Sequence, residues 1–126
     1  MLENARRIHQ FFSQLGCPYK YSGATYLQEV VCNAVNNNIA FGYLGDLCAP
    51  IAKKYQTSTG NIERNIRTLI SKWWEYDRCG EIFIGKPTVS EAIHTLISKV
   101  NAEFMKEWYK LNKESGCTCE INKPKP

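Results

Sequence analysis

Apolar residues recur three and four positions apart in five separate segments of this chain, and no other feature constrains its fold so strongly. Residues with this spacing lie on one face of an α-helix, so each segment predicts a helix with one apolar side. The predicted helices cover residues 2–15, 23–37, 42–55, 58–76 and 88–113. Pro50 lies inside the third segment, where it either kinks the helix or begins a new one. The sequence therefore predicts an all-α fold, a compact bundle of five to six helices.

Residues with known preferences for helix ends separate these segments. Gly16 and Pro18 end the first helix, because Gly terminates helices and Pro cannot extend one. Three consecutive asparagines at residues 36–38 break the second helix. The motif Thr88-Val89-Ser90-Glu91 is a capping box that begins the last helix. Residues 81–85 form a short extended piece that is either one strand or a packed loop.

The length of 126 residues fits a single domain, which we expect to span residues 1–113. Residues 114–126 have no apolar pattern and are expected to form a disordered tail. No apolar run approaches the ~18 residues that cross a bilayer, and the N-terminus lacks the apolar segment of a secretion signal. The sequence therefore predicts a cytoplasmic protein with no membrane partner.

The positive charge of the chain is concentrated in one stretch. Residues 47–72 hold five basic residues and one acidic residue, which accounts for the whole net charge of +4. The basic and acidic residues elsewhere cancel. We therefore expect a polyanion such as nucleic acid to bind at this stretch.

Six cysteines raise the question of disulfide bonds or a zinc site. Cys32 and Cys48 lie on apolar helix faces, where we expect buried thiols, and the chain has no Cys-x-x-Cys pair. Cys117 and Cys119 supply only half of a metal site, and they lie on the predicted tail. We therefore expect reduced cysteines, no metal and no cofactor.

The charged stretch contains a short helix, a tight turn and an amphipathic helix with polar residues on its outer face. This is the plan of a helix-turn-helix, whose second helix enters the major groove of duplex DNA. Arg donates to guanine or phosphate, Asn pairs with adenine, Glu accepts from cytosine, and Lys and Thr near the turn hold phosphates. The candidate DNA-binding residues are Lys53, Lys54, Thr57, Ser58, Thr59, Asn61, Glu63, Arg64, Asn65, Arg67 and Thr68.

Other functions remain open at this point. A polar outer face is also typical of any surface helix, so the alternative is a protein-interaction adaptor or an anti-regulator that keeps the fold but does not bind DNA. RNA binding ranks below both, because we expect the aromatic residues to fill the core, with Trp73 buried and Trp74 undecided. His94 has no Ser, Cys or Asp partner at a meaningful spacing, which favours a structural histidine. No catalytic motif is visible, so the chain is not expected to be an enzyme.

The run of residues 51–67 resembles the DNA-binding effector domain of the sporulation initiation response regulator, stage-zero sporulation factor A. In that family a Pro-x-Ile-Ala-Lys-Lys-aromatic helix leads through a Thr-rich turn into Val-Glu-Arg-x-Ile-Arg, and residues 50–55 and 62–67 match this arrangement. The start of the second predicted helix, residues 23–29, is also similar to the family's Gly-Tyr-x-Tyr-Leu-Arg-Glu. The similarity covers roughly residues 8–100 and is densest over residues 50–74.

This resemblance implies an all-α bacterial domain that binds short DNA boxes, often in tandem copies bound by a homodimer, and that regulates transcription in sporulation. It implies base-edge and phosphate contacts for Glu63, Arg64 and Arg67. Asn61 stands where the family usually has a base-reading arginine. Because Arg favours guanine and Asn favours adenine, we expect a different target sequence here.

Two further departures limit what the resemblance implies. The family's longer segment after the recognition helix is implicated in contact with the RNA polymerase sigma factor. Here it has shrunk to about residues 77–85, so the resemblance implies a contact with the sigma factor, and activation of the polymerase, only weakly. The family also has an N-terminal receiver domain, for which there is no room before residue 1. Phosphorylation control is therefore expected to be absent if this chain is the whole protein.

Overall fold

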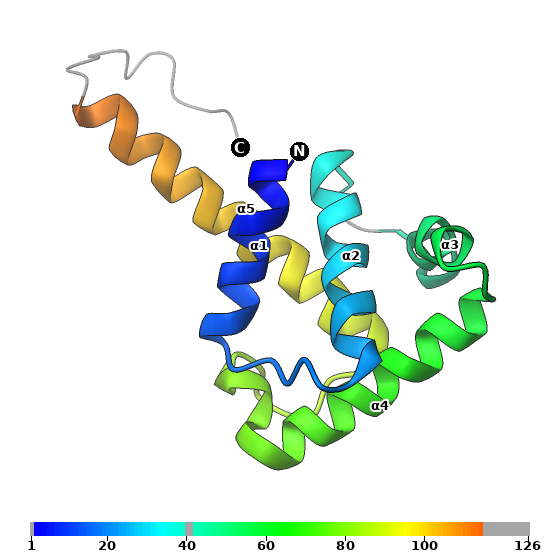
Figure 1. Cartoon of the computed structure of the whole chain (residues 1–126). Coiled ribbons are helices and arrows are strands. Elements are labelled where there is room, and N and C mark those ends of the chain that lie inside the picture. Colours follow the sequence, from blue (N-terminus) through cyan, green and yellow to red (C-terminus); the bar gives the residue numbers. More distant parts are fainter. Residues whose placement is uncertain (1, 40–41, 115–126) are drawn as a thin grey trace.

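The computed structural model describes residues 2–39 and 42–114 as a bundle of helices (Figure 1). These residues form five α-helices and one short 3-10 helix, and they contain no strand. The elements are α1 (Leu2–Gln14), α2 (Ser22–Asn36), α3 (Leu44–Lys54), α4 (Thr59–Asp77), η1 (Arg78–Glu81) and α5 (Val89–Glu114). The all-α bundle predicted from the spacing of apolar residues is thus confirmed.

Helix α2 lies at the centre of the bundle, because it packs against each of the other four α-helices. Its apolar residues are numerous enough to cover more than one side of the helix. Those that are buried are Gly23, Ala24, Leu27, Val30, Val31, Ala34 and Val35. No described polar or charged residue is fully buried, so removal of apolar surface from water is the main source of stability. Trp73 of α4, which is only 1% exposed, is part of this core as predicted.

Pro50 leaves α3 as one continuous helix rather than dividing it in two. Proline has no N–H group to donate to the carbonyl group four residues earlier, which here belongs to Asp46. Both residues are exposed, so water has access to this side of the helix. The bundle therefore has five α-helices within the described part of the chain, rather than six.

The sequence left either a strand or a packed loop open for residues 81–85, and the segment after α4 forms turns. Arg78 has a φ of 60°, in the left-handed region, and so ends α4. Cys79 and Glu81 also have positive φ values, of 56° and 62°. Residues 82–85 then form a turn and bends, and Ile82 and Phe83 pack against the core. The extended piece expected at residues 81–85 is therefore a packed loop and not a strand.

Helix α5 begins with the predicted capping box. The N–H of Glu91 donates to Thr88 Oγ1 at 3.1 Å, and the N–H of Thr88 donates to Glu91 Oε1 at 2.9 Å. The apolar stripe of α5 is buried only as far as Val100, and Trp108 is 43% exposed. The reason is that the C-terminal half of α5 extends past the rest of the bundle (Figure 1). Residues 115–126, which cover almost all of the predicted tail, lie outside the described residues.

Candidate nucleic-acid interface

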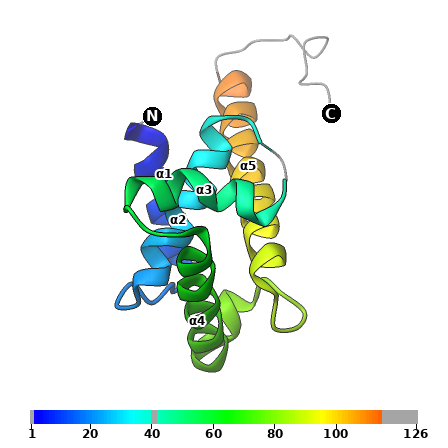
Figure 2. The ribbon, with the colours of Figure 1, turned by 90° about the vertical axis from the view of Figure 1, so that its right-hand side faces the viewer.

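A short turn at residues 55–58 joins α3 to α4. Gln56 has a φ of 55°, which directs the chain away from α3. The N–H of Thr57 donates to the carbonyl oxygen of Ala52 at 2.9 Å and closes the end of α3. Ser58 then caps α4, because its Oγ accepts a hydrogen bond from the N–H of Asn61 at 3.0 Å. As a result α3 runs across the N-terminal end of α4 in a defined orientation (Figure 2).

The inner faces of α3 and α4 pack against each other and leave the polar face of α4 outside. Leu47 and Ile51 of α3 are buried, as are Ile62 and Ile66 of α4. Residues 62 and 66 are one turn apart, so they fix which side of α4 faces the bundle. The opposite side, which carries Arg64, Arg67 and Thr68, therefore points away from the core. The candidates Asn61, Glu63 and Asn65 are half-buried at its borders.

The outer face of α4 is basic and accessible. Arg64, Arg67 and Thr68 are exposed, and Lys72 continues the same face one turn later. The acidic residue of this stretch, Glu63, is partly buried and lies with Oε1 4.0 Å from Arg67 Nη2. A surface pair of this kind is worth about 0.3–0.5 kcal/mol, so Arg67 remains available to a stronger anion.

A network of hydrogen bonds holds the asparagines of α4. Asn61 Oδ1 accepts from Arg64 Nη1 at 3.2 Å and from Asn65 Nδ2 at 3.3 Å. Asn65 Nδ2 also donates to the carbonyl oxygen of Asn61 at 2.8 Å. From the other side, Ser22 Oγ of α2 donates to Asn65 Oδ1 at 3.1 Å. Asn65 is therefore tied to α2, whereas Arg64 is held over Asn61 near the start of the helix.

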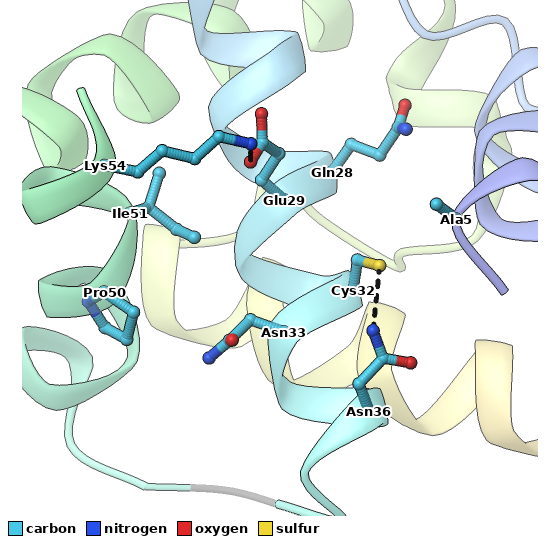
Figure 3. Close-up of a pocket in the computed structure, with 9 residues that line it drawn as sticks. All are labelled: Ala5, Gln28, Glu29, Cys32, Asn33, Asn36, Pro50, Ile51 and Lys54. Atoms are coloured by element: carbon cyan, nitrogen blue, oxygen red, sulfur yellow. Dashed lines mark hydrogen bonds and ion pairs between the residues drawn. The ribbon is translucent and has the colours of Figure 1, made fainter. Parts of the chain in front are cut away.

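Lys54 at the end of α3 forms an ion pair with α2. Its Nζ lies 2.6 Å from Glu29 Oε1, as Figure 3 shows. The hydroxyl of Tyr55 donates to the other oxygen of the same carboxylate. This hydrogen bond to Glu29 is the main reason that the pKa of Tyr55 is raised to about 12. The charge of Lys54 is thus partly neutralised in the free protein, while its neighbour Lys53 is exposed and has no ion pair in the described part of the chain.

The remaining candidate residues surround the turn. Ser58 is exposed, whereas Thr57 and Thr59 are half-buried. Thr57 and Ser58 take part in the turn and the cap, so both have a structural role whether or not they contact a ligand. Thr59 is the first residue of α4. The structure therefore places the candidate residues at the end of α3, in the turn and along the first turns of α4.

Two contacts to this region were missed by the sequence analysis, namely those from Ser22 and Glu29. Both residues lie on α2, and they are separated in sequence from their partners Asn65 and Lys54 by 43 and 25 residues. The similarity of residues 23–29 to the family motif at the start of that helix included Glu29, whereas no sequence signal pointed to Ser22. Local periodicity carries no information about such contacts.

A cavity of about 470 Å³ opens between α1, α2 and α3 beside the ion pair of Lys54 and Glu29 (Figure 3). Side-chain amides and a thiol line much of it, and Asn36 Nδ2 donates to Cys32 Sγ at 3.6 Å. Cys32 is partly exposed here, which corrects the expectation of a buried thiol. The expectation fails because Cys32, although it packs against the edge of the core, also lines the cavity and is reached by solvent there.

The other described cysteines, Cys17, Cys48 and Cys79, are buried and reduced. Burial raises the pKa of Cys48 to about 11 and those of Cys17 and Cys79 to about 12. Within residues 2–39 and 42–114, no three His, Cys, Asp or Glu side chains are grouped so that they could hold a metal ion. Cys117 and Cys119 lie outside the described residues.

His94 has a serine partner, contrary to the sequence analysis. Its Nδ1 lies 3.3 Å from Ser90 Oγ, one turn earlier on α5. Its Nε2 lies 3.1 Å from the carbonyl oxygen and 3.3 Å from the amide nitrogen of Gly42. These contacts connect α5 to the segment before α3, which is a structural role.

The fold and this surface define a small all-α domain in which α4 presents a polar face with Arg64 and Arg67 to solvent. The family model described as "Sporulation initiation factor Spo0A C terminal" matches residues 8–109, and the chain therefore belongs to this family. The family is one of DNA-binding domains in transcription regulation, and it is not a family of enzymes. No solved structure gives a significant match to the chain. Among the described helices, none is both long and apolar enough to cross a membrane.

Proposed function

We propose that this domain binds duplex DNA in a sequence-specific manner and regulates transcription, with α3 and α4 acting as a helix-turn-helix. In this proposal the N-terminal half of α4 enters the major groove. Asn61, Glu63 and Arg64 contact base edges, while Arg67 and the residues of the turn hold phosphates.

The observation that carries the proposal is the outer face of α4. Arg64, Arg67 and Thr68 are exposed on a helix whose other side is fixed in the core by Ile62 and Ile66. The exposed cations belong to the stretch that contains the whole net charge of the chain. Membership of a DNA-binding family supports the same assignment.

The family resemblance also suggests how the domain is used. We propose that two copies bind tandem sites as a homodimer and that this takes place in the bacterial cytoplasm. A contact with the RNA polymerase sigma factor is a weaker proposal, because the segment after α4 is short and forms turns.

The test is a selection of bound sequences from random duplex DNA, followed by measurement of affinity at several salt concentrations. Log affinity should fall with log salt at ~0.9 per neutralised phosphate. Arg64→Ala should lose the selected motif, whereas Lys99→Ala, which removes an exposed cation from α5, should keep it.

The alternative is a protein-interaction adaptor, which predicts a different outcome of this selection and of the affinity measurements. In that case the selection returns no enriched motif, and affinity for duplex DNA stays weak in Arg64→Ala and in the unaltered protein alike. A helix that binds DNA without reading it would show the salt dependence but no motif, and would contradict the sequence-specific part of the proposal.

A further inference from the structure

A second basic surface lies beside the C-terminal half of α4. It is a cleft of about 400 Å³ between α4 and the loop that joins α1 to α2. The side chains that give it its character are three tyrosines and two lysines. We call it the Tyr-Lys cleft, and these residues are Tyr19, Lys20, Tyr21, Lys72 and Tyr76.

The loop is held along α4 at both of its ends. At one end, Ser22 Oγ donates to Asn65 Oδ1 at 3.1 Å. At the other end, a Cβ atom added to Gly16 would lie 2.8 Å from Asp77 Oδ2, so the two residues are in close contact. The loop therefore runs antiparallel to α4, from beside residue 77 to beside residue 65, and Figure 1 shows it next to that helix.

The side chains that line the Tyr-Lys cleft include two cations, Lys20 and Lys72. No acidic side chain of the described residues lines it, although Glu75 and Asp77 are on the same helix. Neither Lys20 nor Lys72 takes part in an ion pair within the described part of the chain. The Nζ of Lys20 lies 5.3 Å from the centre of the Tyr21 ring, and Tyr76 is 77% exposed. The cleft thus offers two ammonium groups and an accessible tyrosine to an anionic partner.

The position of the Tyr-Lys cleft identifies that partner. Residues 61, 65, 68 and 72 fall on one face of α4, so Lys72 continues the face proposed to enter the groove. From Asn61 to Lys72 the helix rises by roughly 16 Å, at about 1.5 Å per residue. The major groove is only about 12 Å wide. When α4 crosses the groove with Asn61 inside it, Lys72 therefore lies at the sugar-phosphate backbone on the edge of the groove.

We propose that the Tyr-Lys cleft binds the DNA backbone that flanks the major groove, with Lys20 and Lys72 contacting phosphates and Tyr76 donating to a phosphate oxygen. This inference rests on the proposed function, because it needs α4 in the groove. It adds the loop between α1 and α2 as a separate contact that contributes to affinity and to the register on DNA, without reading bases.

The test compares Lys20→Ala/Lys72→Ala with the unaltered protein on the selected duplex. The salt slope should fall by roughly two contacts, about 1.8 in log-log units, while the selected motif stays the same. Lys20→Arg/Lys72→Arg should keep the slope, because both charges remain. Lys99→Ala is the matched control, since Lys99 is also exposed but lies on α5. Circular dichroism verifies that each variant is folded.

The outcomes separate this inference from the proposed function. If Arg64→Ala abolishes the motif but Lys20→Ala/Lys72→Ala leaves the slope unchanged, the cleft does not touch DNA and only this inference fails. If the unaltered protein does not bind duplex DNA, the proposed function fails and this inference fails with it. An unchanged slope together with binding of inorganic phosphate or a mononucleotide at the cleft would identify a small-anion site and would also overturn the inference.

Discussion

Gly23 of α2 lies directly against the backbone of Asn65 in α4. A Cβ atom at position 23 would be 2.1 Å from the carbonyl oxygen of Asn65, much closer than any real contact allows. The next residue back, Ser22, donates to the side chain of Asn65. These two contacts set the distance between the central helix and the helix proposed to read DNA.

Gly23→Ala should therefore destabilise the protein. The added methyl group forces α2 and α4 apart, and overpacking of this kind typically costs about 1–3 kcal/mol of unfolding free energy. Gly45→Ala is the matched control, because nothing lies within 4 Å of its Cβ position in α3. We expect that variant to be as stable as the unaltered protein or up to about 1 kcal/mol more stable. Urea unfolding followed by circular dichroism measures both, and equal stability of the two variants would contradict the close approach.

Ser58 allows the cap of α4 to be separated from a contact with phosphate. Ser58→Ala removes the acceptor for the N–H of Asn61 and should cost about 1 kcal/mol of stability. Ser58→Asp keeps an acceptor and should retain stability, but it adds a negative charge at the DNA surface. We therefore expect Ser58→Asp to be as stable as the unaltered protein and to bind DNA more weakly. Retention of full DNA affinity by Ser58→Asp would place the turn away from the phosphates.

Asn61 and Arg67 should differ in what they contribute to DNA binding. Asn61→Arg should shift the selected motif towards guanine at one position, because a good bidentate base contact is worth ~1–3 kcal/mol of discrimination. It should leave non-specific affinity similar or higher. Arg67→Ala should weaken binding to all sequences about equally and lower the salt slope by roughly one contact.

The reverse result would show that α4 docks differently. If Asn61→Arg leaves the selected motif unchanged while Arg67→Ala alters it, the base-reading side of the helix is nearer Arg67. If neither change affects DNA binding, α4 faces a protein partner, and the adaptor becomes the better description.

The described thiols should react at different rates. Burial raises the pKa of all four thiols, to about 12, 11 and 12 for Cys17, Cys48 and Cys79. Cys32 differs because it is partly exposed, whereas the other three are buried. The thiolate is the reactive form, so at pH 8 a thiol reagent should modify Cys32 first and the other three only on unfolding. Measurement in a Cys117→Ser/Cys119→Ser background removes the two thiols outside the described residues. Equal rates for all four would contradict the burial seen here.

The same pKa values predict a loss of stability at alkaline pH. Burial favours the neutral thiol in the folded state, whereas the unfolded thiols ionise near pH 8.5. The folded protein therefore binds more protons above this pH, and its stability falls as pH rises from about 9 towards the folded pKa values. Cys48→Ala should make the decline shallower by up to ~1.4 kcal/mol per pH unit, in urea unfolding at pH 7, 9 and 10. If the unfolding free energies of Cys48→Ala and the unaltered protein depend on pH in the same way, a raised pKa for Cys48 is ruled out.

Much of this protein was predictable from the sequence, because the features concerned are local. An amphipathic period, a capping box and a proline in a helix each depend on residues within about one turn of one another. The five α-helices, the buried Trp73 and the capping box at Thr88 were predicted on this basis and are confirmed. The concentration of charge in residues 47–72 is likewise a property of the sequence alone.

The tertiary structure decided the features that depend on how the helices pack. Glu29 neutralises part of the charge of Lys54, Ser22 holds Asn65, and the loop after α1 lies beside α4. Packing also decided that Cys32 borders a cavity and that Trp108 is exposed where α5 leaves the bundle. The sequence determined which face of each helix is apolar, since that follows from spacing along the chain. It did not reveal which polar groups would meet across the helices, because those contacts join residues tens of positions apart whose proximity exists only once the core has formed.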